Sequence, residues 1–139
     1  MPIEDLARSD TVTADPETPV VDLAATMAEE NVGSVVITTD GTPVGIVTDR
    51  DLTVRVLGEG SDPTEQTAKD VMTDDLHTIE PRAGFYEAAE LMAEQGIRRL
   101  PVSDGDTLTG IITVDDISEL LADEQQHLGD IIRAQRPEY

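Results

Sequence analysis

Residues 45–51, GIVTDRD, are repeated 65 residues later as residues 110–116, GIITVDD, and the architecture of the chain follows from this repeat. In both copies an apolar run ends at a threonine, and an aspartate follows three residues later. This spacing is typical of a capping box, which satisfies the free N–H groups at a helix N-terminus. The same terminus suits a phosphate, because it carries unpaired N–H groups and the positive end of the helix dipole. The segment therefore predicts a strand-to-helix junction that is either a cap alone or also a ligand site.

The repeat extends well beyond these two segments. Shifting the chain by 65 residues aligns residues 11–57 with residues 76–122 without a gap, and 11 of the 47 aligned positions are identical. Many other positions exchange one apolar side chain for another, as at Val32 and Ile97. Because one short unit often cannot close a core by itself, the two units are expected to bury their apolar faces against each other.

Each copy carries the same order of expected elements. A helix is predicted with Thr18 as N-cap and Pro19 as first helical residue, and its counterpart covers residues 84–95. β-Branched runs indicate strands over residues 35–37 and 100–102, followed by turns, by strands over residues 44–47 and 108–112, and by helices that begin at Thr48 and Thr113. The first helix of each copy is expected to bury one face. Helical spacing places Val20, Leu23, Ala24 and Met27 on that face in the first copy, and Phe85, Ala88, Ala89 and Met92 in the second.

This order predicts an α/β sandwich of two pseudo-symmetric β-α-β-β-α units packed through their sheets, because both apolar strand runs need helices to cover them. The first unit is expected over residues 1–60, a linker over residues 61–66 and the second unit over residues 67–123. A C-terminal helix or tail is expected over residues 124–139, with a break or bend near Gly129.

Charge and composition exclude several classes of function. The chain has 139 residues, with 30 acidic and 9 basic side chains, and a net charge of −21. Such a surface repels nucleic acid and anionic lipid, so neither is an expected partner. The acidic, lysine-poor composition resembles that of proteins from salt-loving organisms. The absence of cysteine excludes disulfides and cysteine-ligated metals, and the sequence shows neither a signal peptide nor a spanning apolar run, so a cytoplasmic location is expected.

The repeated units resemble tandem cystathionine-β-synthase-type (CBS) domains, a pair known as a Bateman module. The resemblance rests on the two Gly-x-x-Thr-x-x-Asp segments, on residues 71–73 (VMT) and on residues 96–102 (GIRRLPV), and it covers residues 3–122. It implies clefts between the copies that bind AMP, ADP, ATP, S-adenosylmethionine or NAD as a regulatory ligand, without an obligatory cofactor or metal.

The resemblance also implies roles for individual residues. Asp51 and Asp116 would hold the ribose, with Thr48 and Thr113 beside them. Phosphate needs cations, and Arg50, Arg98 and Arg99 are the candidates; the alternative is that these arginines pair with surrounding acids. The cleft of the first motif is favoured for a phosphorylated ligand, since Asp115 replaces Arg50 in the second. The adenine pockets would be lined by Thr13, Ala14, Thr78 and Ile79, and framed by Val36, Ile37, Pro101 and Val102.

The function expected from this reasoning is that of a stand-alone regulatory module that signals to an unknown effector protein. The alternative is a dimerising scaffold with vestigial pockets, and enzymatic activity is not expected because the sequence shows no catalytic constellation. A homodimer is expected, through an apolar patch formed by the helices that begin at Val20-Val21 and Phe85-Tyr86.

Overall fold

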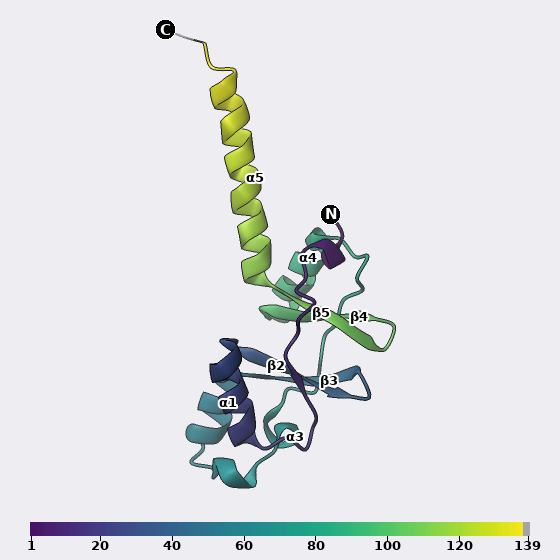
Figure 1. Cartoon of the computed structure of the whole chain (residues 1–139), viewed down its shortest axis with the longest axis vertical. Coiled ribbons are helices and arrows are strands. Elements are labelled where there is room, and N and C mark those ends of the chain that lie inside the picture. Colours follow the sequence, from purple (N-terminus) through teal and green to yellow (C-terminus); the bar gives the residue numbers. More distant parts are fainter. Residues whose placement is uncertain (138–139) are drawn as a thin grey trace.

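The computed structural model describes residues 1–137, and its elements form two halves in the same order (Figure 1). The first half contains β1 (Thr13–Ala14), α1 (Val20–Glu30), β2 (Ser34–Thr39), β3 (Thr42–Thr48) and α2 (Asp49–Asp51), which continues as a wider helical turn over Leu52–Leu57. The second contains α4 (Phe85–Gln95), β4 (Arg99–Asp104), β5 (Thr107–Thr113) and α5 (Val114–Ala134). Three short helical segments complete the described chain: Ile3–Asp5, Pro63–Glu65 and α3 (Ala68–Val71).

The two halves have matching sheets. In the first, β1 runs parallel to β2, and β2 runs antiparallel to β3. In the second, β4 pairs antiparallel with β5, and a parallel bridge from Ile79 to Val102 stands where β1 stands in the first half. The sheets stack in the centre of the molecule, with α1 and α4 at its outer sides (Figure 1). This arrangement confirms the predicted α/β class.

Each half is completed by the segment that precedes the other half in the sequence. The N-terminal segment, residues 3–8, packs on the second half, where Ile3 is fully buried in the core. The segment of residues 68–73 packs on the first half, where Ala68 and Val71 are buried. We call these two stretches the lead segments. Each lead segment packs on the half formed by the other repeat. A sequence repeat and a packed core therefore do not contain the same residues.

The two lead segments use the same backbone hydrogen bonds. Arg8 N–H donates to the carbonyl of Ile111, and Ile111 N–H donates to the carbonyl of Arg8, both at 3.0 Å. Thr73 forms the same pair of bonds with Ile46, at 3.0 and 3.1 Å. Arg8 and Thr73 are 65 residues apart, so they occupy equivalent positions in the two halves.

Helix α1 begins one residue later than predicted. Pro19 is the N-cap, and it makes no side-chain capping bond, so Thr18 is not the cap. Ala24 and Ala89 are exposed, although the helical spacing assigned both to the buried face. The buried stripe is narrower than predicted, because α1 and α4 each rest on a single small sheet.

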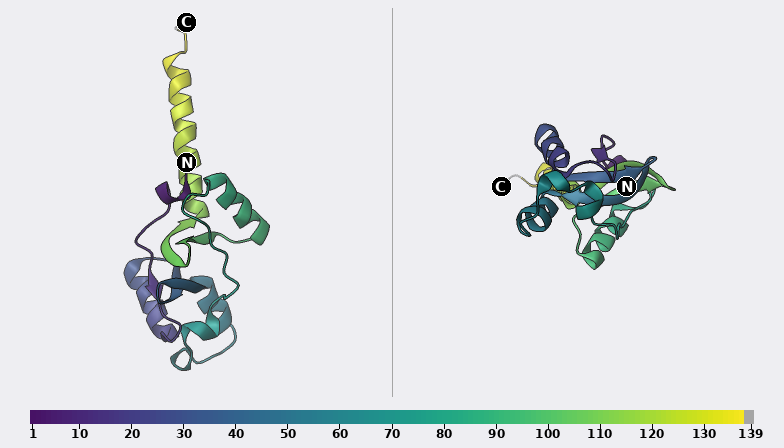
Figure 2. Two further views of the ribbon diagram at one scale, coloured as in Figure 1. Left: turned by 90° about the vertical axis from the view of Figure 1, so that its right-hand side faces the viewer. Right: turned by 90° about the horizontal axis from the view of Figure 1, so that it is seen from below.

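Helix α5 runs without a break through Gly129, contrary to the predicted bend. A glycine inside a helix costs only about 1 kcal/mol relative to alanine, which lowers stability without ending the helix. Most of α5 projects away from the two sheets, as the left view of Figure 2 shows. Helices α1 and α4 pack on different cores and lie apart in Figures 1 and 2, so they do not form the predicted common patch.

The close contact between the N-terminal lead segment and β5 predicts that a larger residue at Gly110 lowers the stability of the fold. A Cβ added at Gly110 would lie 2.7 Å from the carbonyl oxygen of Arg8, which is too close for both to stay in place. We expect Gly110→Ala to lower the free energy of unfolding by about 1–3 kcal/mol, as for other overpacked sites. Urea denaturation of the full chain measures this change.

The matched control is Gly129→Ala, because a Cβ there meets only the flexible end of Arg133, at 3.5 Å. This variant should leave the stability unchanged or raise it, since alanine favours a helix interior. Equal losses in the two variants would contradict the importance of the close contact at Gly110.

Candidate functional site

The two repeated motifs form capping boxes at strand-to-helix junctions. In the first, Thr48 N–H donates to Asp51 Oδ2 at 2.9 Å, and Asp51 N–H donates to the Thr48 hydroxyl at 3.1 Å. In the second, Thr113 N–H donates to Asp116 Oδ2 at 2.9 Å, and Asp116 N–H donates to the Thr113 hydroxyl at 3.3 Å. The structural role predicted for these residues is therefore present at both junctions.

A third Thr-x-x-Asp box lies outside the repeated motifs, at the start of α3. Thr67 N–H donates to Asp70 Oδ2 at 2.9 Å. This backbone hydrogen bond is the main cause of the lowered pKa of Asp70. Neither residue lines the cleft described below, so this box provides an internal reference for capping without a ligand site.

A cleft of about 320 Å³ opens between the two halves, beside the N-terminus of α5. One wall comes from the first half, with the turn after α1 and the start of β2. The other wall comes from the second half, with the start of β4 and the β5–α5 junction, and the chain that leads into β1 closes one side. The lining residues are Arg8, Asp10, Thr11, Val12, Glu30, Asn31, Val32, Gly33, Ser34, Val36, Arg98, Arg99, Ile111, Thr113 and Asp115.

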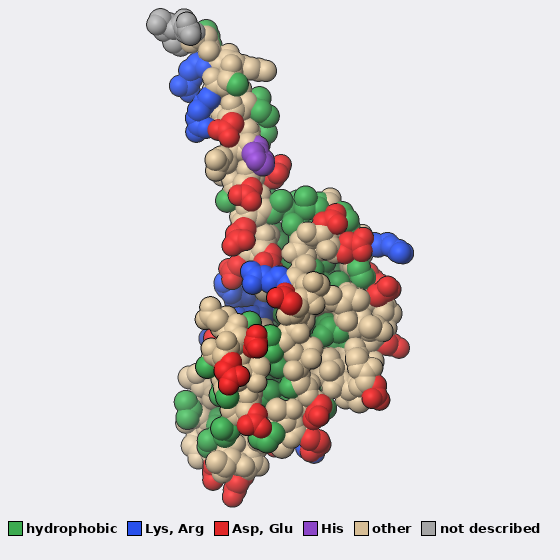
Figure 3. All heavy atoms as spheres, viewed as in Figure 1, with side chains coloured by type: hydrophobic (Ala, Val, Ile, Leu, Met, Phe, Trp, Pro, Cys, Tyr) green, Lys and Arg blue, Asp and Glu red, His purple; other side chains and the backbone are tan. Residues whose placement is uncertain are grey.

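Three of the nine basic residues of the chain line this cleft: Arg8, Arg98 and Arg99. Basic side chains gather between the halves near the base of α5 (Figure 3). Three acids also line it, namely Asp10, Glu30 and Asp115, so its lining is formally neutral in a protein of net charge −21. Relative to the rest of the surface, the cleft is therefore favourable for an anion.

Arg98 and Arg99 have different surroundings in the cleft. Arg98 lies 3.7 Å from Asp115, and both side chains are largely exposed, so their attraction is weak. Arg99 reaches toward the first half, where its Nη2 lies 3.0 Å from the position of a Cβ added at Gly33. A side chain at position 33 would therefore crowd the guanidinium, and the glycine leaves Arg99 room beside the cleft.

The two motif aspartates differ in what their second carboxylate oxygen contacts. Asp116 Oδ1 accepts hydrogen bonds from Arg8 Nε at 3.2 Å and Nη2 at 3.1 Å. Asp51 Oδ1 lies 3.9 Å from Arg55 Nε, which is too long for a hydrogen bond, while Arg55 Nη1 donates to the carbonyl of Val71 at 2.8 Å. One motif thus carries a direct arginine contact and the other does not.

The structure distributes the predicted site residues over several places. Val36, Arg98, Arg99 and Thr113 line the cleft, and Asp116 lies behind Arg8. Ile37, Pro101, Ile79 and Val102 are buried within the two halves, and Thr13 and Ala14 pair with Val36 and Ile37. Thr78 lies beside Ile79 in a shallow acidic depression along α4. Thr48, Arg50 and Asp51 form the first junction and are not among the lining residues of this cleft.

Sequence reasoning missed the residues that reach the cleft from outside the motifs. Thr11 and Val12 line it, whereas the residues predicted for this segment were Thr13 and Ala14. The turn after α1, residues 31–34, also lines the cleft, but no site was predicted there. Arg8 gives no signal in the sequence, because its position depends on the exchange of the lead segments.

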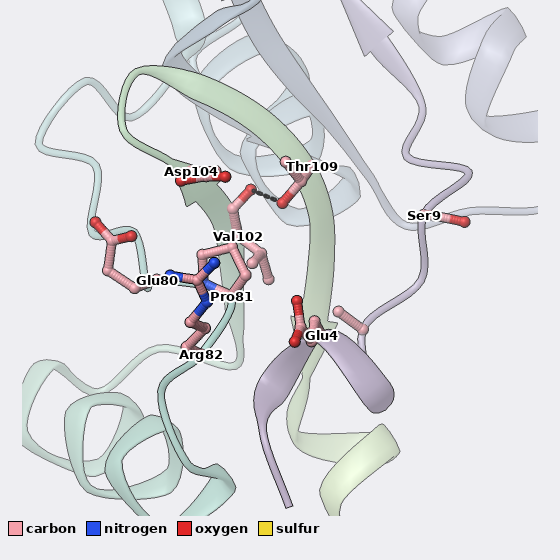
Figure 4. Close-up of a pocket in the computed structure, with 9 residues that line it drawn as sticks. Glu4, Ser9, Glu80, Pro81, Arg82, Val102, Asp104 and Thr109 are labelled. Carbon is pink, nitrogen blue, oxygen red and sulfur yellow. Dashed lines mark hydrogen bonds between the residues drawn. The ribbon is translucent and has the colours of Figure 1, made fainter.

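A second pocket of about 220 Å³ lies between the N-terminal helical turn and the β4–β5 hairpin (Figure 4). Glu4, Glu80 and Asp104 line it together with a single cation, Arg82. The Thr109 hydroxyl donates to the carbonyl of Val102 at 3.3 Å across its wall. With three carboxylates for one guanidinium, this pocket suits an anionic ligand less well than the cleft does.

Within residues 1–137, no group of three or more histidine or acidic side chains is placed to hold a metal ion. None of the helices in this range is both long enough and apolar enough to span a bilayer.

The sequence profile of the CBS domain matches residues 3–58 and again residues 68–123. The chain is 40% identical over 120 residues to an uncharacterized protein of Methanopyrus kandleri, a match that covers 85% of this chain and 61% of that protein. It is 30% identical over 116 residues to the CBS domain-containing protein YhcV of Bacillus subtilis, covering 84% and 82% of the two chains. The CBS domain pair of protein MJ0100, solved with 5′-methylthioadenosine and S-adenosyl-L-methionine, matches with a TM-score of 0.81 and 24% identity over 89% of this chain and 98% of that chain, which shows the fold alone.

The three capping boxes are each expected to contribute to the stability of the folded chain. We expect Thr48→Ala, Thr67→Ala and Thr113→Ala each to lower the free energy of unfolding by about 1 kcal/mol, because each removes a side-chain cap. Urea denaturation without any ligand measures the three losses. A loss at Thr67 without one at Thr113 would show that the threonine at the cleft contributes little as a cap.

Proposed function

Because this chain belongs to the CBS-domain family, we propose that it is a regulatory module whose cleft binds a phosphorylated, adenosine-containing ligand. The single observation that carries the proposal is the cleft between the halves, where Arg98 and Arg99 meet the N-terminus of α5. Guanidinium groups form bidentate hydrogen bonds with phosphate, and the free N–H groups of a helix N-terminus add further donors.

The other parts of the ligand have corresponding positions. Asp116 lies one helical turn inside the same junction, where its carboxylate would accept hydrogen bonds from the ribose hydroxyls, as an acid does in dinucleotide folds. Val12 and Val36 supply apolar surface for the base. AMP, ADP and ATP fit this arrangement of cations better than S-adenosylmethionine does, since its sulfonium is positively charged.

The position of the arginines favours the second motif for the phosphate, in place of the first. Arg50 was the reason to favour the first motif, but it does not line the cleft. Arg98 and Arg99 do, together with Thr113 of the second motif. The phosphate proposal therefore rests on the junction of β5 with α5.

Helix α5 is the proposed route to the effector protein. Thr113 is its N-cap and Asp115 lies in its first turn, so a ligand in the cleft contacts the base of the helix. The rest of α5 projects from the body of the protein (Figure 1). A ligand that prefers one arrangement of the halves would shift the population of α5 positions, which is the requirement for a switch.

Ligand binding is tested with AMP, ATP, S-adenosylmethionine and NAD in denaturation experiments at molar salt. At 100 times its dissociation constant, a ligand that binds only the folded chain adds about 2.7 kcal/mol to the free energy of unfolding. We expect AMP or ATP to give this increase. The Arg98→Ala/Arg99→Ala double variant should lose about tenfold or more in affinity by calorimetry, because charge-assisted hydrogen bonds are lost.

Two matched variants serve as controls. Arg50→Ala removes an arginine at the first junction and should change the affinity by less than about twofold, since only distant screening is altered. Asp70→Asn changes a capping box outside the cleft, and it should keep the affinity that Asp116→Asn loses. If none of the four compounds stabilises the wild-type chain, the sensor function is wrong.

A second candidate function is that of a dimerising scaffold, and the projecting part of α5 favours it. Leu121, Leu128, Ile131 and Ile132 are each more than half exposed, and their spacing places them on one side of the helix. Nearly all residues of α5 from Leu121 onward are exposed, and most helical stability in proteins comes from tertiary packing, so a partner would stabilise this part of the helix.

A second copy of this chain, bound antiparallel, is the partner that the charges favour. Residues 114–124 of α5 contain five acids and no basic residue, whereas residues 125–134 contain one acid, Arg133 and His127. Antiparallel pairing places each acidic half beside the less acidic half of the other helix. The net charge of −21 on each chain opposes association, so the dimer should strengthen as salt screens the repulsion.

Sedimentation equilibrium at molar salt tests the dimer. Leu128→Asp combined with Ile132→Asp should weaken dimerisation by about tenfold or more, because it places charges in an apolar interface. Leu57→Asp is the control, since Leu57 is a leucine of the first half that is also more than half exposed. A wild-type chain that stays monomeric at every salt concentration would exclude this pairing.

A further inference from the structure

The Arg8 side chain covers the carboxylate that the proposed function assigns to the ribose. Asp116 Oδ2 already accepts hydrogen bonds from the N–H and the hydroxyl of Thr113, at 2.9 and 3.0 Å. Its other oxygen, Oδ1, is the one that could face a ligand, and both hydrogen bonds from Arg8 end there. The Asp116 side chain is only 9% exposed, so a ribose cannot reach it unless Arg8 moves.

The backbone of Arg8 is fixed, whereas its side chain is free to turn. Two backbone hydrogen bonds with Ile111 hold the residue on β5, and Gly110 allows the close approach. The side chain is 62% exposed, so water can replace part of what its guanidinium loses on leaving Asp116. A new anionic partner within reach is therefore enough to displace Arg8 from Asp116.

The cleft would supply that partner when it contains a phosphate. Arg8 lines the cleft together with Arg98 and Arg99, on which the proposed phosphate site rests. The acids of the lining, Asp10, Glu30 and Asp115, also face this region, but none of them forms an ion pair with Arg8 among the described residues. A bound phosphate would attract the guanidinium and leave Asp116 Oδ1 open to the ribose.

The first half has the same backbone arrangement, but no arginine on its lead segment covers the motif aspartate. Thr73 occupies the position equivalent to Arg8 and forms the same backbone bonds with Ile46. Its short side chain has no charge to offer Asp51, whose Oδ1 has only the distant Arg55 at 3.9 Å. The difference between the two junctions is therefore one side chain on an exchanged lead segment.

We infer that Arg8 is a specificity-determining residue that makes the second-motif cleft select phosphorylated over unphosphorylated adenosine compounds. An unphosphorylated compound must displace Arg8 from Asp116 without giving it a new anionic partner. A phosphorylated compound exchanges one anionic partner for another and gains a third arginine. The inference rests on the proposed function, and it adds the reason for which the cleft would reject the nucleoside.

Calorimetry with AMP and adenosine on the full chain tests the inference. The wild-type chain should bind AMP about tenfold or more tightly than adenosine, as expected when charge-assisted hydrogen bonds are present in only one complex. Arg8→Thr copies the residue at the equivalent position of the first half. It should bind adenosine more tightly and AMP more weakly than the wild type, so the ratio of the two affinities should fall at least fivefold.

The control is Arg133→Ala, which also removes one positive charge, but far along α5, where Arg133 pairs with Asp130 at 2.7 Å. This variant should keep the wild-type ratio. The unfolding midpoint of Arg8→Thr, measured in parallel, tests whether the fold is kept, which we expect because residue 8 is bonded to β5 through its backbone and Ile3 stays buried.

Three outcomes separate the inference from the proposed function. An unchanged ratio in Arg8→Thr, with AMP still bound, overturns the role of Arg8 and leaves the ligand site in place. Equal affinities of the wild type for AMP and adenosine overturn the role of Arg8 together with the phosphate site at Arg98 and Arg99, and leave only the adenosine site in place. Absence of binding by either compound to every variant overturns the proposed adenosine site and the inference together.

Discussion

The carbonyl oxygen of Arg8 lies against the backbone of Gly110. This close contact holds the N-terminal lead segment on the second half of the molecule. The equivalent contact brings residues 72–73 against Gly45 in the first half. Each half thus receives a buried part of its core from the other unit of sequence. Because neither core is complete without this exchange, the halves depend on each other, and the cleft between them has a defined shape.

The exchange also explains why one threonine and one aspartate could serve two purposes at the cleft. The capping box uses only Asp116 Oδ2, and the second oxygen of the carboxylate remains for another donor. In the box at Thr67 and Asp70, the same chemistry stands away from the cleft and does no more than begin a helix. In the proposed function, a motif of this kind would acquire its binding role from its surroundings, which here are the opposite half and a lead segment.

The sequence predicts what depends on local spacing, and it fails where distant segments meet. The strands, the turns and the helices that follow Thr48 and Thr113 were predicted, because apolar periodicity and capping residues are local and the repeat shows them twice. The contact between Arg8 and Asp116 joins residues 108 positions apart, and periodicity carries no information about it. Arg50 was favoured for the phosphate because it lies within a motif, but proximity in sequence to a motif does not place a side chain in the cleft.

The acidic surface acts on the cleft and on α5 through the same physical effect. A net charge of −21 repels a phosphorylated ligand and a second copy of the chain alike at low ionic strength. At 1 M salt the Debye length is about 3 Å, so this repulsion is nearly screened, whereas hydrogen bonds between an arginine and a phosphate act at contact distance. Under those conditions the proposed site would select its ligand through the positions of Arg8, Arg98 and Arg99. In this proposal the overall charge sets the salt concentration that binding requires, and Arg8 on the lead segment sets the choice of ligand.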